Sequence, residues 1–404
     1  MDELHLSYGL AGALAAALAL ISFKMRQVPV SEPMLALVLG IALGPQLLGL
    51  VEISDHVRDL ILLEGSRLIV ALSVMAAALR FPASDLGRVV RPVLLLLALV
   101  MPLAAVISGA ASLVMGLPLA LAALIGACLC PTDPVLASSV VSGSPAEKDL
   151  PGRLRHTLSV ESGINDGLAL PLVGLALVAV LPAETLGATA GHLTYQVLVG
   201  VVIGVAAGAL AGWGVRLATK DRELEPAPDL ILPLLLAVAV LGLAKVAHTD
   251  GILAVFVAGT VYNRLVTGEE REPQQGVDEA VNRYFALPLF LVLGIVLPWD
   301  QWADLGPAAA LFVLLVLGLR RLPLVLALAR PMQLQKQQAV FLGWFGPMGV
   351  SSLFYLAHSL DKGVTDPRFF AVGSLMVAVS VVAYGLTSSP GRNLYARSAG
   401  RDSS

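Results

Sequence analysis

The stretch CLCPTDPVLASS, residues 128–139, lies inside a long apolar run and holds Asp133 between two prolines, Pro131 and Pro134. Each proline removes a backbone donor and leaves a carbonyl without its partner about one turn earlier, so the segment predicts a helix that is interrupted in its middle. An aspartate at such an interruption is costly unless protein buries it or water reaches it. The rest of the chain must supply that environment.

The composition is typical of a membrane protein. Of 404 residues, 57% are hydrophobic and 14% are charged, whereas soluble domains have roughly 45–50% apolar and about 25% charged residues. Apolar stretches near the roughly 20 residues that cross a bilayer recur along almost the whole chain, with short polar loops between them. We therefore expect an all-α polytopic membrane protein that forms one transmembrane domain over residues 1–404, with the lipid bilayer around it and no nucleic-acid partner.

The polar breaks predict about thirteen spans. Alternate breaks hold 19 of the 26 Lys and Arg residues, so the positive-inside rule puts the amino terminus outside and the carboxyl terminus in the cytoplasm, with the protein in the cell membrane. If the seventh span is a connector, the six spans on either side of it form inverted repeats, as in many secondary transporters. The predicted spans are 6–23, 30–50, 60–79, 92–115, 117–142, 154–182, 193–215, 230–248, 251–266, 281–297, 305–329, 337–359 and 368–387.

A second interruption lies in the twelfth span, which occupies the same place in the second half as the fifth span does in the first. The sequence there is GWFGPMGVSS, residues 343–352, and Gly346, Pro347 and Gly349 are its helix-breaking residues. Paired broken helices indicate a substrate site near the middle of the membrane, where free carbonyls and helix ends supply ligands. Independent proline kinks, which membrane helices tolerate, are the alternative.

Three carboxylates lie well inside the predicted spans: Asp133, and Glu161 and Asp166 in VESGINDGLALP. Each needs a partner or water at that depth. Glu161 could form a structural ion pair with Arg320 or Arg321 of the eleventh span.

Asp166 has no cation nearby in the sequence. Burial then favours its protonated form, so that a proton and a metal cation compete for it. A site that holds either one, and that opens alternately to the two sides, gives antiport.

These motifs resemble those of the monovalent cation–proton antiporters, in the branch of bacterial sodium–proton antiporters and eukaryotic sodium–hydrogen exchangers. The resemblance rests on PTDPV in a broken fifth helix, ESGINDG in the sixth and GWFGPMG in a broken twelfth. It implies a homodimer in which scaffold and dimerisation helices stay fixed while a core, about 92–182 and 305–387, moves across the membrane. It also implies a transporter rather than an enzyme, with no cofactor beyond the transported Na⁺ (or Li⁺ or K⁺) and H⁺.

The resemblance assigns the cation- and proton-binding aspartate to Asp166 and the helix-break pair to Thr132 and Asp133, with Ser162 and Asn165 as supporting polar groups. The transported metal cation would thus lie at Asp166 and Asp133. Relatives with Asn-Asp at this place are usually electroneutral, which implies one cation for one proton.

The family's stabilising Glu–Arg pair falls on Glu161 with Arg320 or Arg321. One position departs from the pattern: relatives often have Gly-Pro-Arg-Gly at the second break, where this chain has Met348. We therefore expect a positive charge to be missing near the crossed half-helices. Residues 75–78 also lack a carboxylate that some relatives carry late in the third span.

Other functions remain as alternatives. The same oxygen ligands bind Na⁺, Li⁺ and K⁺, so a K⁺/H⁺ antiporter is the first alternative to Na⁺/H⁺ exchange. A channel or a sodium-coupled symporter would move no protons against the cation. An intramembrane aspartyl protease could use Asp133 and Asp166 as a hydrolytic dyad, but it leaves Asn165 and the second broken helix without a purpose.

Overall fold

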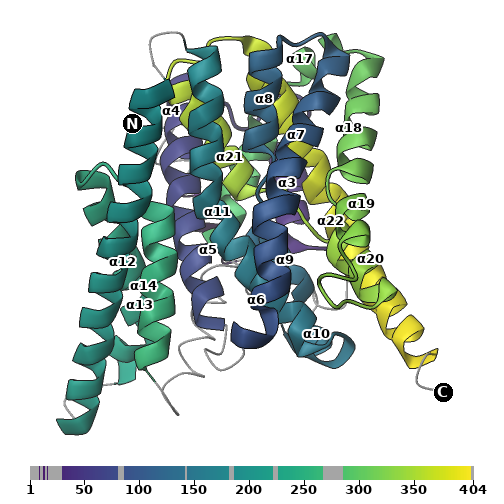
Figure 1. Cartoon of the computed structure of the whole chain (residues 1–404). Coiled ribbons are helices and arrows are strands. Elements are labelled where there is room, and N and C mark those ends of the chain that lie inside the picture. Colours follow the sequence, from purple (N-terminus) through teal and green to yellow (C-terminus); the bar gives the residue numbers. More distant parts are fainter. Residues whose placement is uncertain are drawn as a thin grey trace.

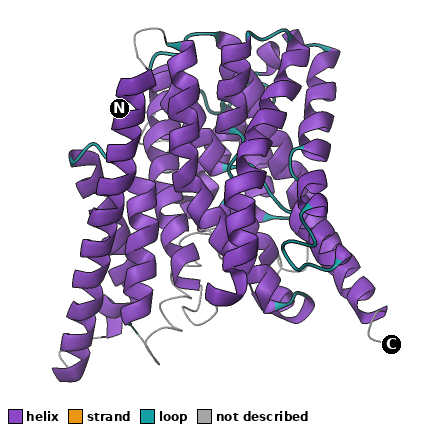
Figure 2. Ribbon diagram, viewed as in Figure 1, coloured by secondary structure: helices purple, strands orange, loops and turns teal. Residues whose placement is uncertain are grey.

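The structure is a computed structural model that describes residues 30–80, 86–141, 143–181, 186–221, 226–266 and 285–401, with four isolated positions, Gly9, Gly12, Ala13 and Ala16. Within these ranges the chain is helical and contains no β-strand (Figure 2). The prediction of an all-α fold is therefore confirmed. Most of the predicted span 6–23, and the break at 267–284, lie outside the described residues.

The first half contains the predicted spans from the second to the sixth. π-Helical turns at Ile61–Gly65 and Leu96–Val100 join α4 to α5 and α6 to α7 as continuous helices. The helices are α3 (Glu32–Leu43), α4 (Asp55–Leu60), α5 (Ser66–Arg80), α6 (Leu86–Leu95), α7 (Met101–Ser112), α8 (Leu119–Cys128), α9 (Pro134–Val141), α10 (Gly143–Asp149) and α11 (Gly152–Val180).

The connecting helix α12 (Leu186–Asp221) precedes the second half, which contains α13 (Pro226–Val246), α14 (Gly251–Leu265), α16 (Leu287–Ile295), α17 (Trp299–Asp304), α18 (Pro307–Leu319), α19 (Leu322–Ala327), α20 (Lys336–Trp344), α21 (Val350–Asp361) and α22 (Pro367–Arg401). The predicted eleventh span divides at Arg320, because Pro323 follows within one turn. α22 continues past the predicted end at residue 387, because its last turns pack on aromatic rings of α20, with Tyr395 5.4 Å from Phe341 between ring centroids.

Six helical segments in the described part of the chain are long and apolar enough to cross a bilayer, and four shorter apolar helices accompany them. One of the shorter apolar helices is α8. It is half of a broken helix, and such a half is too short to cross the bilayer by itself. The total of thirteen spans stays a prediction.

Two broken helices meet inside the bundle. Residues 129–133 separate α8 from α9, and residues 345–349 separate α20 from α21. α8 lies above α9, whereas α21 lies above α20, so the two broken helices run in opposite directions (Figure 1). The backbone N–H of Asp133 donates to the carbonyl of Pro347 at 2.8 Å, so the two breaks touch each other.

Glycines let several helices pack backbone to backbone. A Cβ added at Gly200, Gly204 or Gly208 of α12 would lie 2.9, 2.4 or 2.4 Å from a carbonyl oxygen of α14 or of its cap residue. A Cβ added at Gly40 of α3 or at Gly294 of α16 would lie 2.1 or 2.3 Å from a carbonyl oxygen of the other of these two helices. Separations this short exclude any side chain at these positions.

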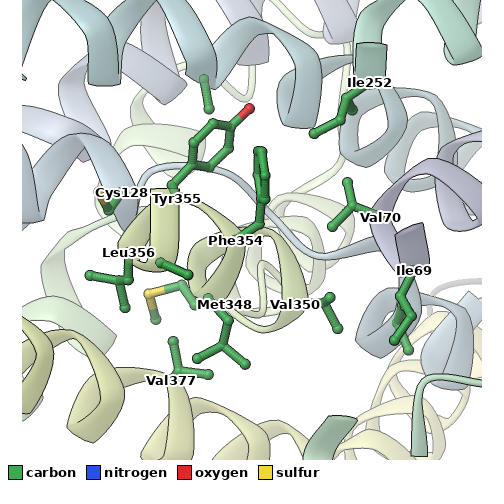
Figure 3. Packing of buried hydrophobic residues seen from close by; sticks show 14 of the residues in the cluster. Ile69, Val70, Cys128, Ile252, Met348, Val350, Phe354, Tyr355, Leu356 and Val377 are labelled. Atoms are coloured by element: carbon green, nitrogen blue, oxygen red, sulfur yellow. The ribbon is translucent and has the colours of Figure 1, made fainter. Parts of the chain in front are cut away.

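Apolar side chains fill the space around the second break. Met348 is 1% exposed and lies beside Leu356 and Val377 (Figure 3). Tyr355 belongs to the same cluster, and its hydroxyl is directed away from Met348 (Figure 3). The side chain at position 348 therefore belongs to the apolar core.

Candidate functional site

Asp133 caps α9 and α21, the two half-helices that begin at the crossing, where the two broken helices meet. Its Oδ1 accepts a hydrogen bond from the Leu136 N–H of α9 at 2.9 Å. Its Oδ2 accepts from the N–H groups of α21, at Val350 and, at 3.3 Å, at Ser351. Helix N-termini carry partial positive charge and free N–H donors, so this buried carboxylate is satisfied by backbone groups from both breaks.

Arg320 binds the C-terminal ends of the other two half-helices, α8 and α20, which end where the broken helices cross. Its guanidinium donates to the carbonyl of Leu129, just past α8, and to that of Gly346, just past α20. The side chain is 2% exposed, and the carbonyls carry the partial negative charge of helix C-termini. The expectation that a positive charge is missing here, based on Met348, is therefore wrong. The positive charge comes instead from Arg320, at the end of α18.

Arg321 pairs with Glu161 in a buried, bidentate ion pair. Its two terminal nitrogens lie 2.8 and 3.0 Å from the two carboxylate oxygens, and the side chains are 7% and 1% exposed. The remaining Nε donates to the carbonyl of Leu342 at 3.0 Å. Of the two arginines that the sequence left as partners, the structure brings Arg321 to Glu161 and Arg320 to the crossing.

Asn165 joins α11 to the first break. Its Nδ2 donates to the Thr132 hydroxyl at 2.6 Å and to Glu161 Oε1 at 2.9 Å, while its Oδ1 accepts from the Thr132 N–H at 3.4 Å. Both residues are almost fully buried. The chain of bonds from Arg321 through Glu161 and Asn165 to Thr132 fixes the first break against α11.

Asp166 lies beside this network and outside it. The residue is fully buried, and no described residue gives either carboxylate oxygen a hydrogen bond of normal geometry. The Ser351 hydroxyl is near enough to interact with the carboxylate, and the hydroxyls of Ser351 and Ser352 also lack partners among the described residues. A buried carboxylate without donors is stable only when it holds a proton or a cation.

Comparison with known proteins supplies the family. The transmembrane sodium/hydrogen exchanger family model matches residues 13–391. The chain belongs to the sodium/hydrogen exchanger family. The chain is 32% identical over 370 residues to Na(+)/H(+) antiporter 2 of Zygosaccharomyces rouxii, a match that covers 88% of this chain and 46% of that one. It is 27% identical over 289 residues to the K(+)/H(+) antiporter NhaP of Alkalimonas amylolytica, covering 70% and 48%.

A solved structure shares the fold of this chain. The sodium proton antiporter MjNhaP1 from Methanocaldococcus jannaschii superposes with a TM-score of 0.76 and 18% identity, over 99% of this chain and 98% of that one. The chain spans less than half the length of the first relatives that it matches.

Other residues near the site differ in how well the sequence indicated them. Ser162 is buried, but its hydroxyl donates to the Ser159 carbonyl at 3.2 Å, within its own helix. Sequence reasoning missed Ser351 and Tyr355, whose hydroxyl donates to the backbone carbonyl of Asp166. The available signal was position, since Ser351 is the second residue of the helix that follows the second break.

Proposed function

We propose that this exchanger moves one monovalent cation across the membrane in exchange for one proton, and that both bind at Asp166. The observation that carries the proposal is the buried Asp166 carboxylate, to which no described residue donates a normal hydrogen bond. Every neighbouring carboxylate has donors, so Asp166 is the group with room for a ligand. A proton or a small cation would supply the missing charge.

The formal charges around the site support a one-for-one exchange. Glu161 and Arg321 neutralise each other as an ion pair. Asp133 and Arg320 have opposite charges and are held by backbone groups of the same two breaks. Asp166 then carries the single uncompensated charge of this cluster, and one proton or one monovalent cation cancels it. This balance favours electroneutral exchange.

For the cation, we propose Asp166 as the direct ligand, together with hydroxyl oxygens at the second break such as that of Ser351. Thr132, Asp133 and Asn165 would hold the first break in the shape that admits the ion, because their polar groups already bond within the protein. Oxygen ligands of this kind suit hard cations. We assign no ligand role to Ser162, whose hydroxyl bonds within its helix.

Na⁺ is the first candidate ion, and K⁺ is the second. Relatives named as Na(+)/H(+) antiporters and as K(+)/H(+) antiporters both match this chain. Selectivity depends on cavity size and on the number of oxygens. The protease alternative has no support, because both oxygens of Asp133 already accept backbone hydrogen bonds and none is free to form a dyad with Asp166.

We also propose a homodimer in the cell membrane, with the amino terminus outside and the carboxyl terminus in the cytoplasm. The moving core would comprise about 92–182 and 305–387, which contain both breaks and α11. The remaining helices would form the scaffold, and the glycine contacts between α12 and α14 support a rigid body there.

Proton flux out of proteoliposomes that contain an internal pH dye tests the exchange, because a cation added outside should enter as a proton leaves. Na⁺, Li⁺ or K⁺ is added outside, with and without a voltage clamp, for the wild type, Asp166→Asn and a matched control, Asp304→Asn, at an exposed aspartate. The proposal predicts a cation-dependent pH change that the clamp leaves unchanged, that Asp166→Asn abolishes and that Asp304→Asn retains. Exchange by Asp166→Asn at the wild-type rate would refute the site, and a rate that follows the voltage would refute electroneutrality.

A further inference from the structure

Two arginines of the proposed scaffold lie against aromatic rings of the proposed core. Both belong to the continuous helix formed by α4, its π-helical turn and α5, whereas the rings belong to α21 and α22. The guanidinium carbon of Arg67 lies 5.4 Å from the centroid of the Phe354 ring, and that of Arg58 lies 5.7 Å from the centroid of the Phe370 ring. A cation is attracted to a ring face within roughly 6 Å of the centroid. The two contacts therefore attract the core to the scaffold.

Each arginine is neutralised by an acid of the scaffold and not of the core. Arg67 pairs with Glu64, which also lies 3.4 Å from Lys245 of α13. Arg58 pairs with Asp59 at 2.9 Å. Moving an arginine away from its ring would thus leave no charge without a counter-ion, and it would cost much less than breaking a buried ion pair. Contacts of this kind can form and release.

The interface between the two contacts is hollow. A cavity of about 270 Å³ is lined on one side by α4 and the π-helical turn, with Asp59 and Leu63, and on the other side by α21, with Ala357 and Asp361. Close packing of side chains is what normally holds two helices together. Dense packing does not join the two bodies in this stretch, which leaves the arginine contacts on either side of it.

The contact between Arg67 and Phe354 lies on the outer side of the proposed cation site. In the proposed orientation α21 runs outward from the second break. Phe354 is three residues beyond Ser351, which places it about one turn nearer the outer surface on the same face of the helix. Phe354 is 5% exposed and Arg67 is 9% exposed. An ion that reaches Ser351 along this face must pass Phe354, and the buried contact closes that route.

We propose that the contacts Arg58–Phe370 and Arg67–Phe354 form an outer clasp, which holds the core against the scaffold and closes the outer route to Asp166. The core releases both rings when the site opens to the outside and regains them when it closes. The strength of the clasp thus sets the fraction of the protein that is open to the outside. This inference rests on the proposed function, because it takes the core to move against the scaffold.

Distances between two spin labels, measured by pulsed electron paramagnetic resonance on the purified protein, test the clasp. The labels are attached at His56→Cys of α4 and Asp361→Cys of α21, which line the cavity from opposite sides. Both native cysteines, Cys128 and Cys130, are buried, and the protein without added cysteines measures their background labelling. Release of the clasp should appear as a second population with a longer distance between the labels.

Replacing each ring with leucine keeps an apolar side chain but removes the attraction to the cation. We expect Phe354→Leu to raise the ratio of open to closed protein about tenfold and Phe370→Leu about two- to fivefold, because a contact between a cation and a ring is stronger where it is desolvated. Phe285→Leu, at a ring that is 61% exposed, is the matched control and should leave the ratio unchanged. An unchanged ratio in Phe354→Leu would overturn the clasp.

A double-variant cycle separates the attraction between cation and ring from a simple loss of packing. Arg67→Gln should shift the ratio as far as Phe354→Leu, and the combined variant should go no further, because each change removes the same contact. Effects that multiply in the combined variant would overturn the proposal. Arg58→Gln and Phe370→Leu form a second cycle at the outer contact, which gives the same test if the Arg67 variants do not fold.

Exchange in proteoliposomes distinguishes failure of the clasp from failure of the proposed function. A larger open fraction should lower the half-saturating cation concentration on the outer side by the same factor. A protein whose label distances respond to Phe354→Leu, but which exchanges no cation for protons, would support the clasp and refute the proposed function. A protein that exchanges ions while Phe354→Leu leaves the label distances unchanged would refute the clasp alone.

Discussion

Replacing Arg321 with methionine is expected to destabilise the protein by about 3–5 kcal/mol, because the change leaves a buried charge without its partner. The structure supports the upper part of this range. Both hydrogen bonds of the pair are short, at 2.8 and 3.0 Å, and Glu161 is 1% exposed. After the substitution the one hydrogen bond that the described residues still give the Glu161 carboxylate comes from Asn165, and the Leu342 carbonyl loses the donor Nε.

Two further variants isolate the charge from the loss of side-chain contacts. The double variant Arg321→Met with Glu161→Met removes both charges, and it should recover most of the stability, since apolar side chains can replace a buried pair at little cost. Arg58→Met is the matched surface control. Arg58 is 27% exposed and pairs with Asp55, whose side chain is 86% exposed, so the loss of this solvent-screened pair should cost less than about 1 kcal/mol.

Equilibrium unfolding in mixed micelles, followed by circular dichroism as the denaturing detergent increases, measures these differences. If Arg321→Met unfolds at the same detergent fraction as Arg58→Met, the Glu161–Arg321 pair is not the buried contact described above. If the double variant is as unstable as Arg321→Met, the damage comes from packing, and the reasoning from charge fails.

Two other perturbations follow from the packing. Arg320→Met leaves the carbonyls of Leu129 and Gly346 without a donor, at about 1–3 kcal/mol for each, and Met348→Arg should not restore stability or exchange in that variant because position 348 lies in the apolar core; rescue in the proteoliposome assay would contradict this. Gly208→Ala forces a Cβ to within 2.4 Å of a carbonyl oxygen of α14 and should cost about 1–3 kcal/mol, whereas Gly214→Ala meets nothing within 4 Å of its Cβ and should be neutral in the same unfolding measurement.

The sequence was sufficient for features that depend on local backbone chemistry. Pro131, Pro134 and Pro347 interrupt helices wherever they lie in the fold, so both breaks could be predicted. Their pairing followed from the order of the spans. An isolated acid such as Asp166 was recognisable because buried carboxylates are rare in membrane helices.

Features that depend on the direction of a side chain were not predictable. Arg320 and Arg321 are adjacent, and the bend before Pro323 sends one to the crossing and the other to Glu161. The expectation based on Met348 failed for the same reason, since a charge can arrive from another helix. The contacts of Arg58 and Arg67 with rings of α22 and α21 join residues far apart in the sequence, so they are visible only once the fold is known.

The fixed charges at the crossing also bear on leakage. If the proposed exchange is correct, a cell keeps its cation gradient only when the protein rarely crosses the membrane with neither a cation nor a proton bound. With Asp133, Arg320, Glu161 and Arg321 cancelling one another, an empty Asp166 would take one bare negative charge through hydrocarbon, at a cost of several kcal/mol. A core in which Asp166 holds a cation or a proton would carry no net charge. Residues that do not bind the ion would thus determine how tightly the membrane holds the gradient.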